Sequence, residues 1–374
     1  MKRIPSLPPA FALCLCLGCA LLLTACWGSA PKPDLVVTPS NSVEATEVAE
    51  PEPESVLPET RPEITIAFVG DMTFSRAGGA SFGDPDALFT SVKPVLSAAD
   101  ITFGNLETPL SGRGKPADKT FVFRGSTEAA TALARACFDI VSIANNHVLD
   151  YGQDAFADTT TALEKAGLAT VGGGANRAEA WTPTILERQG ARVAFLAFSE
   201  ITPDNFAATD SRPGAAYTQD FAAVKKAVKA AAAEADYTVV GMHWGIEGNY
   251  TPSGRQVKEA QALIDAGAMA VLAGHPHVLQ PVEFYGGGII AYSMGNFVFS
   301  PGSSKGRESA ILNLTLTELG PTAVTATPVY LEKYAPKLQS GDRATRILNI
   351  IAESSRARGT KVSIEENKAH FLDP

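Results

Sequence analysis

The chain has 374 residues, of which 45% are hydrophobic, and a formal net charge of −9 at pH 7. A chain of this length and composition can bury a large core, in one domain or in two. The negative charge and the lack of a recurring basic stripe exclude sequence-independent binding to nucleic acid, because such binding requires cations that displace phosphate counterions.

The first 25 residues have the layout of a lipoprotein signal peptide. Lys2 and Arg3 precede an apolar stretch over residues 10–23, which is short for a membrane-spanning helix. The sequence Leu-Thr-Ala-Cys at 23–26 resembles a bacterial lipobox, which implies cleavage before Cys26 and attachment of a lipid to that residue. We therefore expect an extracytoplasmic protein anchored to a bacterial membrane through Cys26. An uncleaved N-terminal anchor helix is the alternative.

The distribution of cysteines agrees with this interpretation. Four of the five cysteines lie within the first 26 residues, and Cys137 alone lies in the rest of the chain. A disulfide within the body of the protein is therefore impossible, and the fold must be held together by its core. The apolar neighbours of Cys137 are typical of a buried structural thiol.

Residues 26–63 predict a disordered acidic tether. This segment is rich in Pro, Glu, Ser, Thr and Val, with Glu-Pro-Glu-Pro-Glu at 50–54, and contains too few large apolar residues to form a core. A proline-bearing acidic segment is semi-extended. Its expected role is to hold the folded domain, residues 64–374, away from the membrane surface.

Within residues 64–374, apolar and β-branched runs alternate with segments of helical spacing, which predicts an α/β fold. The expected strands are 64–69, 101–103, 140–143, 193–198, 238–242, 269–273 and 289–292. The expected helices are 86–98, 154–166, 220–235 and 253–266, several of them opened by Asp or Ser. Near the end, residues 310–319 and 323–331 predict an antiparallel strand pair turned at Gly320-Pro321, followed by a helix over 342–356 that closes the same domain.

Polar side chains follow five of these strands at the point where each strand ends. They include four of the five histidines of the chain. Open α/β sheets expose their sites at the carboxyl ends of the strands. The residues in question are Asp71, Glu107, Asn145-Asn146-His147, His243 and His275-Pro276-His277. Nitrogen and oxygen donors mixed in this way suit one or two divalent metal ions of borderline softness.

The order of these motifs resembles the metallophosphoesterase (calcineurin-like) superfamily, and within it the CapA family of poly-γ-glutamate capsule synthesis proteins. The similar segments are GNLE at 104–107, ANNHVLDYG at 144–152, HWGIE at 243–247, HPHVLQ at 275–280 and SMGNF at 293–297. This resemblance implies a four-layer αββα sandwich. It also implies a role in the synthesis or export of poly-γ-glutamate or a related envelope polymer, with a metal-dependent, phosphoesterase-like hydrolase site.

Carried over residue by residue, the resemblance implies six metal ligands and one general acid. The implied ligands are Asp71, Glu107, Asn146, His243, His275 and His277. His147 is the implied general acid, and the metal would be Mn, Fe or Zn. Two departures weaken the second metal position, because Thr73 stands where the superfamily has a histidine and Glu107 stands where it has an aspartate.

Four further residues near the strand ends are candidates for the substrate groove. They are Arg124, Glu247, Gln280 and Asn296. Arg124 is the candidate anion contact, with an ordinary ion pair as the alternative. For Glu247 and Asn296 we favour a role in orienting a metal-bound histidine, since such histidines donate their second ring nitrogen to an acceptor.

Three functions remain open at this point. The first is a surface-anchored hydrolase or transferase that acts on an anionic polymer or a phosphoester. The second is a non-catalytic partner, with a degenerate metal site, that binds the polymer or a capsule export complex. The third is a general periplasmic phosphoesterase. The fold-level resemblance by itself fixes neither the substrate nor turnover.

Overall fold

The computed structural model describes residues 61–76, 79–201, 203 and 205–373. The expected signal peptide, the lipidation site at Cys26 and nearly all of the expected tether lie outside the described residues. No helix within the described ranges is both long enough and apolar enough to cross a membrane.

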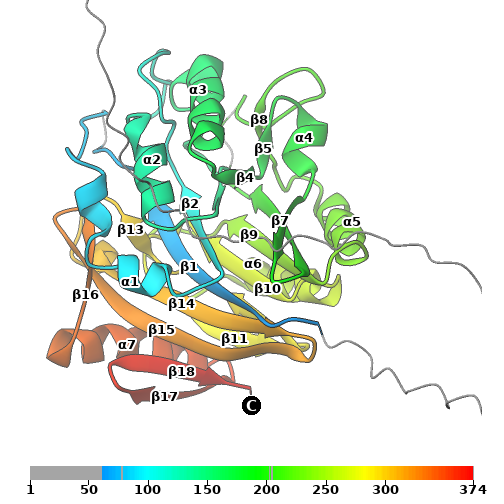
Figure 1. Cartoon of the computed structure of the whole chain (residues 1–374), viewed down its shortest axis with the longest axis vertical. Coiled ribbons are helices and arrows are strands. Elements are labelled where there is room, and N and C mark those ends of the chain that lie inside the picture. The colour runs from blue at the N-terminus through cyan, green and yellow to red at the C-terminus, as the bar shows by residue number, and fades with distance from the viewer. Residues whose placement is uncertain (1–60, 77–78, 202, 204, 374) are drawn as a thin grey trace, which may run out of the picture. The chain divides into compact units, whose positions relative to one another are not determined.

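The first of two large sheets has ten strands (Figure 1). Its path runs β17-β18-β15-β14-β1-β2-β3-β4, with β13 beside β1 and β16 beside β15. The strands are β1 (Ile64–Met72), β2 (Ile101–Leu106), β3 (Ile140–Ser142), β4 (Ala169–Val171), β13 (Asn296–Val298), β14 (Glu308–Thr317), β15 (Gly320–Glu332), β16 (Ala335–Leu338), β17 (Lys361–Glu365) and β18 (Lys368–Leu372). Strands β1 to β4 are parallel, so their carboxyl ends meet at one edge.

The second sheet has six strands in the order β11-β12-β10-β9-β7-β6. They are β6 (Thr184–Arg188), β7 (Ala191–Ser199), β9 (Tyr237–His243), β10 (Ala270–Gly274), β11 (Val282–Tyr285) and β12 (Gly288–Ala291). The four inner strands are parallel, and the two edge strands are antiparallel to their neighbours. A separate short pair joins β5 (Gly173–Gly174) to β8 (Gly214–Ala215).

Alternate residues of the strands face different layers, as the two-residue period of a strand requires. In β1, Ile66 and Phe68 belong to the core between the sheets, whereas Ala67 and Val69 belong to the core under the first group of helices. In β7, Phe195 faces the other sheet. Its neighbours in the strand face the second group of helices. The chain therefore folds into the four-layer αββα sandwich that the sequence predicts.

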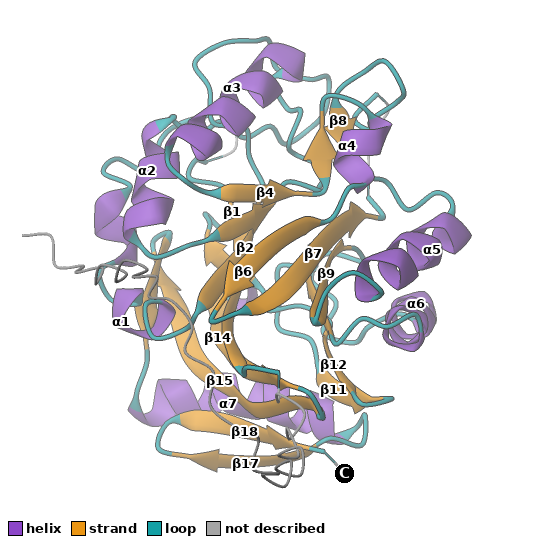
Figure 2. Cartoon of the chain, turned by 45° about the vertical axis from the view of Figure 1, so that its right-hand side comes forward, coloured by secondary structure: helices purple, strands orange, loops and turns teal. Residues whose placement is uncertain are grey.

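Figure 2 shows the helices on the outer sides of the two sheets. The first group contains η1 (Asp86–Phe89), α1 (Lys93–Leu96), α2 (Glu128–Arg135) and α3 (Gly152–Lys165). The second group contains α4 (Arg177–Trp181), α5 (Phe221–Ala232) and α6 (Gly254–Asp265). The last helix, α7 (Gly341–Arg356), packs against the C-terminal strands and β11. A short turn, η2 (Lys305–Arg307), precedes β14.

Three local predictions differ from the structure. The expected helix over 86–98 is split into η1 and α1, because Pro94 has no N–H to continue the helical ladder. The turn between β14 and β15 falls at residues 318–319 rather than at Gly320-Pro321. Cys137 is half-buried rather than buried and has a positive φ of 69°.

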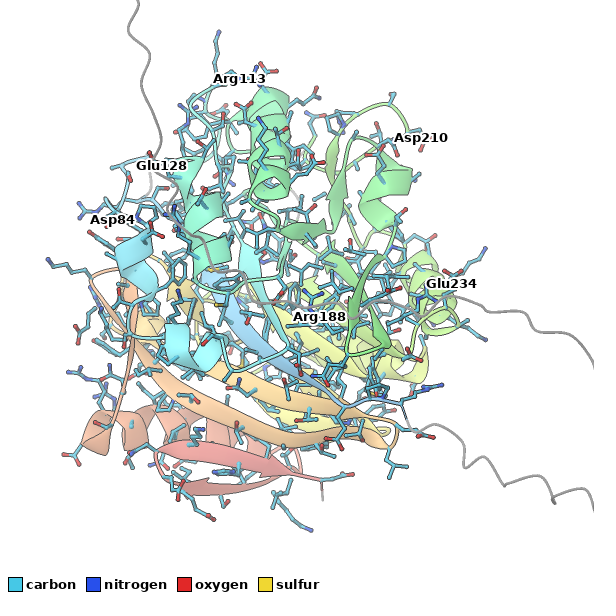
Figure 3. The ribbon with its side chains drawn as sticks, in the orientation of Figure 1. Asp84, Arg113, Glu128, Arg188, Asp210 and Glu234 are labelled. Atoms are coloured by element: carbon cyan, nitrogen blue, oxygen red, sulfur yellow. The ribbon has the colours of Figure 1, made fainter. Side chains whose placement is uncertain are left out.

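Ion pairs at the periphery also connect the two sheets. Arg188 on β6 donates to the carboxylate of Asp139, just before β3, over 2.7 Å. Arg188 also donates to the backbone carbonyl of Asp100 over 3.3 Å. Figure 3 shows Arg188 among the charged side chains that surround the sandwich. These contacts fix the two sheets relative to each other away from the carboxyl ends of the strands.

Candidate metal centre

The strand ends of the two sheets bring all six predicted metal ligands together. Asp71 lies near the end of β1, and Glu107 directly follows β2 in the first sheet. His243 is the last residue of β9, and His275 directly follows β10 in the second sheet. The backbone N–H of His275 donates to Asp71 Oδ2 over 3.0 Å, so the two sheets meet at this point.

The ligand atoms form groups that have Glu107 in common. One group contains Glu107, His243 and His275, and another contains Asp71, Glu107 and His277; within each group the ligand atoms lie within 4.8 Å of one another. His243 Nε2 lies 3.2 Å from Glu107 Oε1 and 3.2 Å from His275 Nδ1. The Asn146 side-chain oxygen lies 2.7 Å from the same His243 nitrogen. Asn146 therefore belongs to the first group.

The carboxylate of Glu107 is the feature that best fits a bound cation. Glu107 is fully buried, and neither of its oxygens has a hydrogen-bond partner among the described residues. A buried carboxylate without a partner is costly, because nothing replaces the water it has lost. Imidazole and carboxylate donors that converge on this carboxylate are the donor set of Zn, Mn or Fe sites. The residues present therefore fit a divalent metal.

The backbone around the His-x-His motif is held in an unusual conformation. His275 has a φ of 93° and His277 a φ of 57°, both in the left-handed region that non-glycine residues avoid. A Cβ on Gly274 would lie 2.3 Å from Asp71 Oδ1, so glycine is required for β10 to approach Asp71. The cost of this backbone is consistent with a functional site rather than an ordinary turn.

The charges within the cluster depend on one another. Burial by itself raises the pKa of Asp71, but the hydrogen bond and charge of His277 outweigh it and hold that pKa well below its usual range. Burial lowers the pKa of His277, but the carboxylates of Glu107 and Asp71 outweigh it and raise the pKa to about 9. Burial, with the charges of His243 and His277, lowers the pKa of His275. Without a metal, His277 thus supplies the positive charge that the two carboxylates require.

Two asparagines that the sequence analysis did not assign hold the ligands in place. Asn105 donates to Asp71 Oδ1 over 2.8 Å, and its side-chain nitrogen lies 3.3 Å from His243 Nδ1. Asn145 donates in turn to Asn105 Oδ1 over 3.0 Å and to the backbone carbonyl of Leu106 over 2.8 Å. Both lie inside the GNLE and ANNH motifs, next to the assigned ligands, and this position is the signal that could have found them.

His147 is oriented by a buried carboxylate. Its Nδ1 lies 2.6 Å from Asp150 Oδ2, and Asp150 is fully buried. Lys119 donates to Asp150 Oδ1 over 2.8 Å and to the backbone carbonyl of Asn146 over 2.7 Å. With Nδ1 occupied in this way, Nε2 is the ring nitrogen left for exchange of a proton with a substrate. The sequence analysis assigned neither Asp150 nor Lys119. Asp150 lies three residues after His147 in the same motif. Lys119 lies 28 residues before His147, so no local pattern indicated its contact.

A cavity of about 470 Å³ lies beside the cluster and receives His147, His277, Glu247 and Asn296. Three phenylalanines, among them Phe123 and Phe299, line it together with prolines, glycines, serines and Lys305. The ring centroid of Phe123 lies 4.6 Å from that of His147, and the ring centroid of Phe299 lies 4.6 Å from that of His277. The exposed Phe121, with 57% of its surface accessible, stands on the same wall.

Asn296 contacts a predicted ligand, and Glu247 lies near two of them. The Asn296 side-chain oxygen lies 2.8 Å from His277 Nδ1, and its nitrogen donates to the backbone carbonyl of His277 over 3.3 Å. Asn296 therefore orients His277. Glu247 is exposed and forms a further potential ligand group with His275 and His277.

The structure does not bring Arg124 and Gln280 to this cavity. The guanidinium of Arg124 lies 3.5 Å from the ring centroid of Tyr151 and donates to the backbone carbonyls of Arg113 and Gly114. One terminal nitrogen of Arg124 is used on the chain itself, and Arg124 does not line the cavity, so this placement does not support an anion contact there. Gln280 is fully buried and donates to the carbonyl of Asn249 over 2.7 Å.

Thr73 adds no ligand at the position where the superfamily has a histidine. It is fully buried, and its hydroxyl donates to the backbone carbonyl of Ser75 over 3.1 Å. Asp71, the carboxylate nearest to it in sequence, already accepts hydrogen bonds from Asn105 and from the His275 backbone. The candidate ligand group around Asp71 therefore gains no donor from Thr73, and its carboxylate is already engaged by the protein.

Comparison with known proteins agrees with this geometry. Residues 65–301 match the family described as bacterial capsule synthesis protein PGA_cap. The chain belongs to this family. It is 31% identical over 313 residues to the PGA biosynthesis protein CapA of Bacillus subtilis, covering 82% of each chain. It is 34% identical over 284 residues to the capsule biosynthesis protein CapA of Bacillus anthracis, covering 74% of this chain and 69% of that protein.

Among solved structures, a hypothetical protein from Thermus thermophilus shares 17% sequence identity with the chain at a TM-score of 0.45. The alignment covers 72% of this chain and all of that protein. A likeness of this strength supports no functional inference.

Proposed function

We propose that this protein is an accessory protein of poly-glutamate capsule synthesis with a divalent metal centre that acts on the polymer or on a phosphoester. The observation that carries the metal centre is the buried, unpartnered carboxylate of Glu107, which two groups of ligands share. The capsule role is supported by the family match and by two relatives named for PGA or capsule biosynthesis.

In this proposal Glu107, Asn146, His243 and His275 hold one metal ion. Asp71 and His277, with Glu107, hold a weaker second one. A bound divalent metal would polarise the bond to be broken and favour a water nucleophile near neutral pH. Asn105 and Asn296 orient the ligands, and the aromatic residues of the cavity keep water away from the imidazoles of His147 and His277.

His147 is the proposed general acid. Asp150 accepts the Nδ1 proton and fixes the ring, while Nε2 holds the proton that the leaving group needs. The Lys119 ammonium lies 2.8 Å from Asp150 Oδ1 and 3.1 Å from His147 Nδ1, so the buried Asp150 carboxylate has a counter-charge beside the ring.

A non-catalytic role in binding the polymer is the second candidate. Thr73 supplies no ligand, and the Asp71 oxygens already accept hydrogen bonds from the protein. A site that holds one metal or none could still bind an anionic chain or a capsule export complex in the cavity beside it.

The metal centre is tested by the metal content of the full chain, purified without chelator. We expect Glu107→Gln and His243→Ala to reduce bound metal at least about tenfold, since each removes a ligand of the firmer position. His370→Ala is the matched control, because His370 lies on β18, outside the ligand groups. Metal content that is unchanged in Glu107→Gln would contradict the proposal.

Turnover is tested with phosphomonoester, phosphodiester and γ-glutamyl substrates on the metal-loaded protein. Hydrolysis that is lost in His147→Ala while the metal is retained would support the enzyme. Stoichiometric metal without hydrolysis of any of the three substrate classes would favour the non-catalytic role.

The proposed location is the extracytoplasmic side of the bacterial membrane, with residues 1–25 removed and residues 26–63 as a tether to the lipid on Cys26. The lipobox and the acidic, proline-rich segment support this proposal. Metabolic labelling with a fatty acid should label the wild type and not Cys26→Ala. Equal labelling of both proteins would exclude the anchor.

A further inference from the structure

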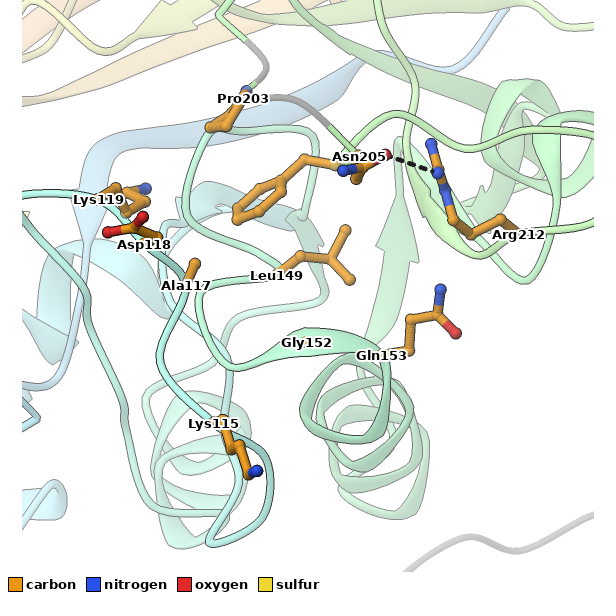
Figure 4. A pocket seen from close by; sticks show the side chains of 11 residues that line it. Lys115, Ala117, Asp118, Lys119, Leu149, Gly152, Gln153, Pro203, Asn205 and Arg212 are labelled. Atoms are coloured by element: carbon orange, nitrogen blue, oxygen red, sulfur yellow. Dashed lines mark hydrogen bonds between the residues drawn. The ribbon is translucent and has the colours of Figure 1, made fainter.

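A second cavity lies behind the dyad of His147 and Asp150. It has a volume of about 650 Å³, within the range of about 300–1,000 Å³ typical of ligand sites. Figure 4 shows the residues that line it, among them Lys115, Lys119 and Arg212. The sequence analysis assigned none of these residues, and the proposed metal centre uses none of them as ligands.

The lining of this cavity is basic in a chain whose net charge is −9. Its lining contains three cationic side chains and one carboxylate, that of Asp118. The ammonium of Lys119 is already used by Asp150 and by the backbone carbonyl of Asn146. Lys115 is exposed and forms no hydrogen bond or ion pair with any described residue, so its charge is free for a ligand.

Arg212 is a prepared anion contact on the other side of the cavity. It donates to the side chain of Asn205 over 3.0 Å, the dashed line in Figure 4, and to the carbonyl of Ala207 over 3.2 Å. Its Nε is buried and has no partner within the described part of the chain. The guanidinium is thus held in place by two hydrogen bonds, and each of its terminal nitrogens keeps a second N–H for a carboxylate in the cavity that Arg212 lines.

The first turn of α3 adds to the positive potential in this cavity. Gly152 and Gln153, its first two residues, line the cavity, and no side chain caps the helix at Tyr151. The unpaired N–H groups of a helix start carry partial positive charge. The carboxylate of Asp154 in the same turn reduces this contribution, so the helix supports the two cations and does not replace them.

One short segment, residues 147–149, contributes to both cavities. His147 lines the cavity beside the metal ligands, and Leu149, two residues later, lines the second one. Lys119 lines the second cavity and also contacts Asp150, which orients His147. A chain with charges at regular intervals could therefore place one unit at the metal centre and a neighbouring charge in the second cavity.

We propose that the second cavity is a subsite for a carboxylate of an anionic polymer, held by Lys115 and Arg212, next to the unit on which the metal centre acts. Two separated cations opposite Asp118 suit single carboxylates along a chain better than a dense cluster of phosphates. This subsite rests on the proposed function, because the polymer is the substrate class that the family match supports.

Binding of a γ-linked glutamate oligomer to the full chain, treated with chelator, tests the subsite independently of the metal. We expect Lys115→Gln to weaken binding about three- to tenfold, and Lys115→Gln with Arg212→Gln to weaken it more than about tenfold. Binding should also weaken as salt is added, since these contacts are partly exposed. Lys225→Gln on α5 is the matched control for general charge, with less than about a twofold effect expected.

Several outcomes would overturn the subsite. They are a double variant that binds the oligomer as tightly as wild type, and a control that weakens binding equally. A neutral glutamine oligomer that binds equally well, or inorganic phosphate that displaces the glutamate oligomer at low millimolar concentration, would also overturn it. If Arg212→Gln lowers the melting temperature, Lys115→Glu replaces the double variant, with a loss larger than that of Lys115→Gln. Absence of metal would count against the metal centre alone, because the oligomer is measured without metal.

Discussion

At the scale of single residues, the pair of Asp150 and Lys119 both stabilises a buried charge and orients His147. Asp150 is fully buried and accepts hydrogen bonds from Lys119 and from the Phe123 backbone, besides contacting His147. The Lys119 side chain is 20% exposed, so its charge is only weakly screened by water. The proposed general acid, His147, and the segment 147–149 that contributes to both cavities thus depend on one ion pair.

We predict that Lys119→Met destabilises the fold by about 3 kcal/mol, because it leaves the Asp150 carboxylate buried without its cation. Urea unfolding followed by circular dichroism measures this loss. Lys225→Met, which removes an exposed lysine of α5, should change the unfolding free energy by less than about 0.5 kcal/mol. A loss below about 1 kcal/mol in Lys119→Met would show that Asp150 has another counter-charge.

At the scale of elements, the helices differ in how their starts are capped. Helix α6 begins with a full capping box, in which the Ser253 side chain accepts from the Gln256 backbone and Gln256 bonds back to Ser253. Helix α2 begins at Glu128, and its N-cap residue Thr127 makes no side-chain capping bond. Gln256 also donates to Gln280, which ties the start of α6 to the segment that follows the His-x-His motif.

We predict that Ser253→Ala costs about 1 kcal/mol of stability, because the first turn of α6 loses the acceptor for an N–H group. Thr127→Ala should cost close to zero, since no bond is lost there. Thermal or urea unfolding of the two variants side by side gives the comparison. Equal losses in both would mean that the cap geometry contributes nothing.

At the scale of the whole molecule, the core between the two sheets supports the metal centre. Phe103 on β2 lies between Phe68 of its own sheet and Phe195 of the other, with ring centroids 5.4 Å away in both cases. The proposed ligand Glu107 follows the same strand. Packing of the two sheets therefore sets the separation between the carboxylates of one sheet and the histidines of the other.

We predict that Phe103→Ala lowers the unfolding free energy by about 4 kcal/mol, because it leaves a cavity between the sheets. Leu372→Ala on the edge strand β18, where the side chain is 56% exposed, is the control and should change stability by less than about 0.5 kcal/mol. A loss in Phe103→Ala below about 1.5 kcal/mol would indicate that the two sheets close over the space.

The sequence pattern by itself determined the α/β class, most of the inner strands and the polar strand ends that hold the metal-ligand candidates, whereas the sandwich was implied by the family resemblance. Apolar runs of strand length mark the buried strands, and Asp71, Glu107, His243 and His275 lie at the carboxyl ends of four of them. Carboxyl ends of parallel strands meet at one edge, so residues distant in the chain, once placed there, are close in space.

Only the tertiary structure decided which side chains complete the site. The paths of loops are not encoded in a periodic pattern, so the sequence could not show that Lys119 reaches Asp150 or that Arg124 lies on Tyr151. The sequence could not show the cationic cavity either, because Lys115 and Arg212 come from two loops that only the fold brings together. Periodicity specifies elements, whereas contacts between loops depend on how the finished elements pack.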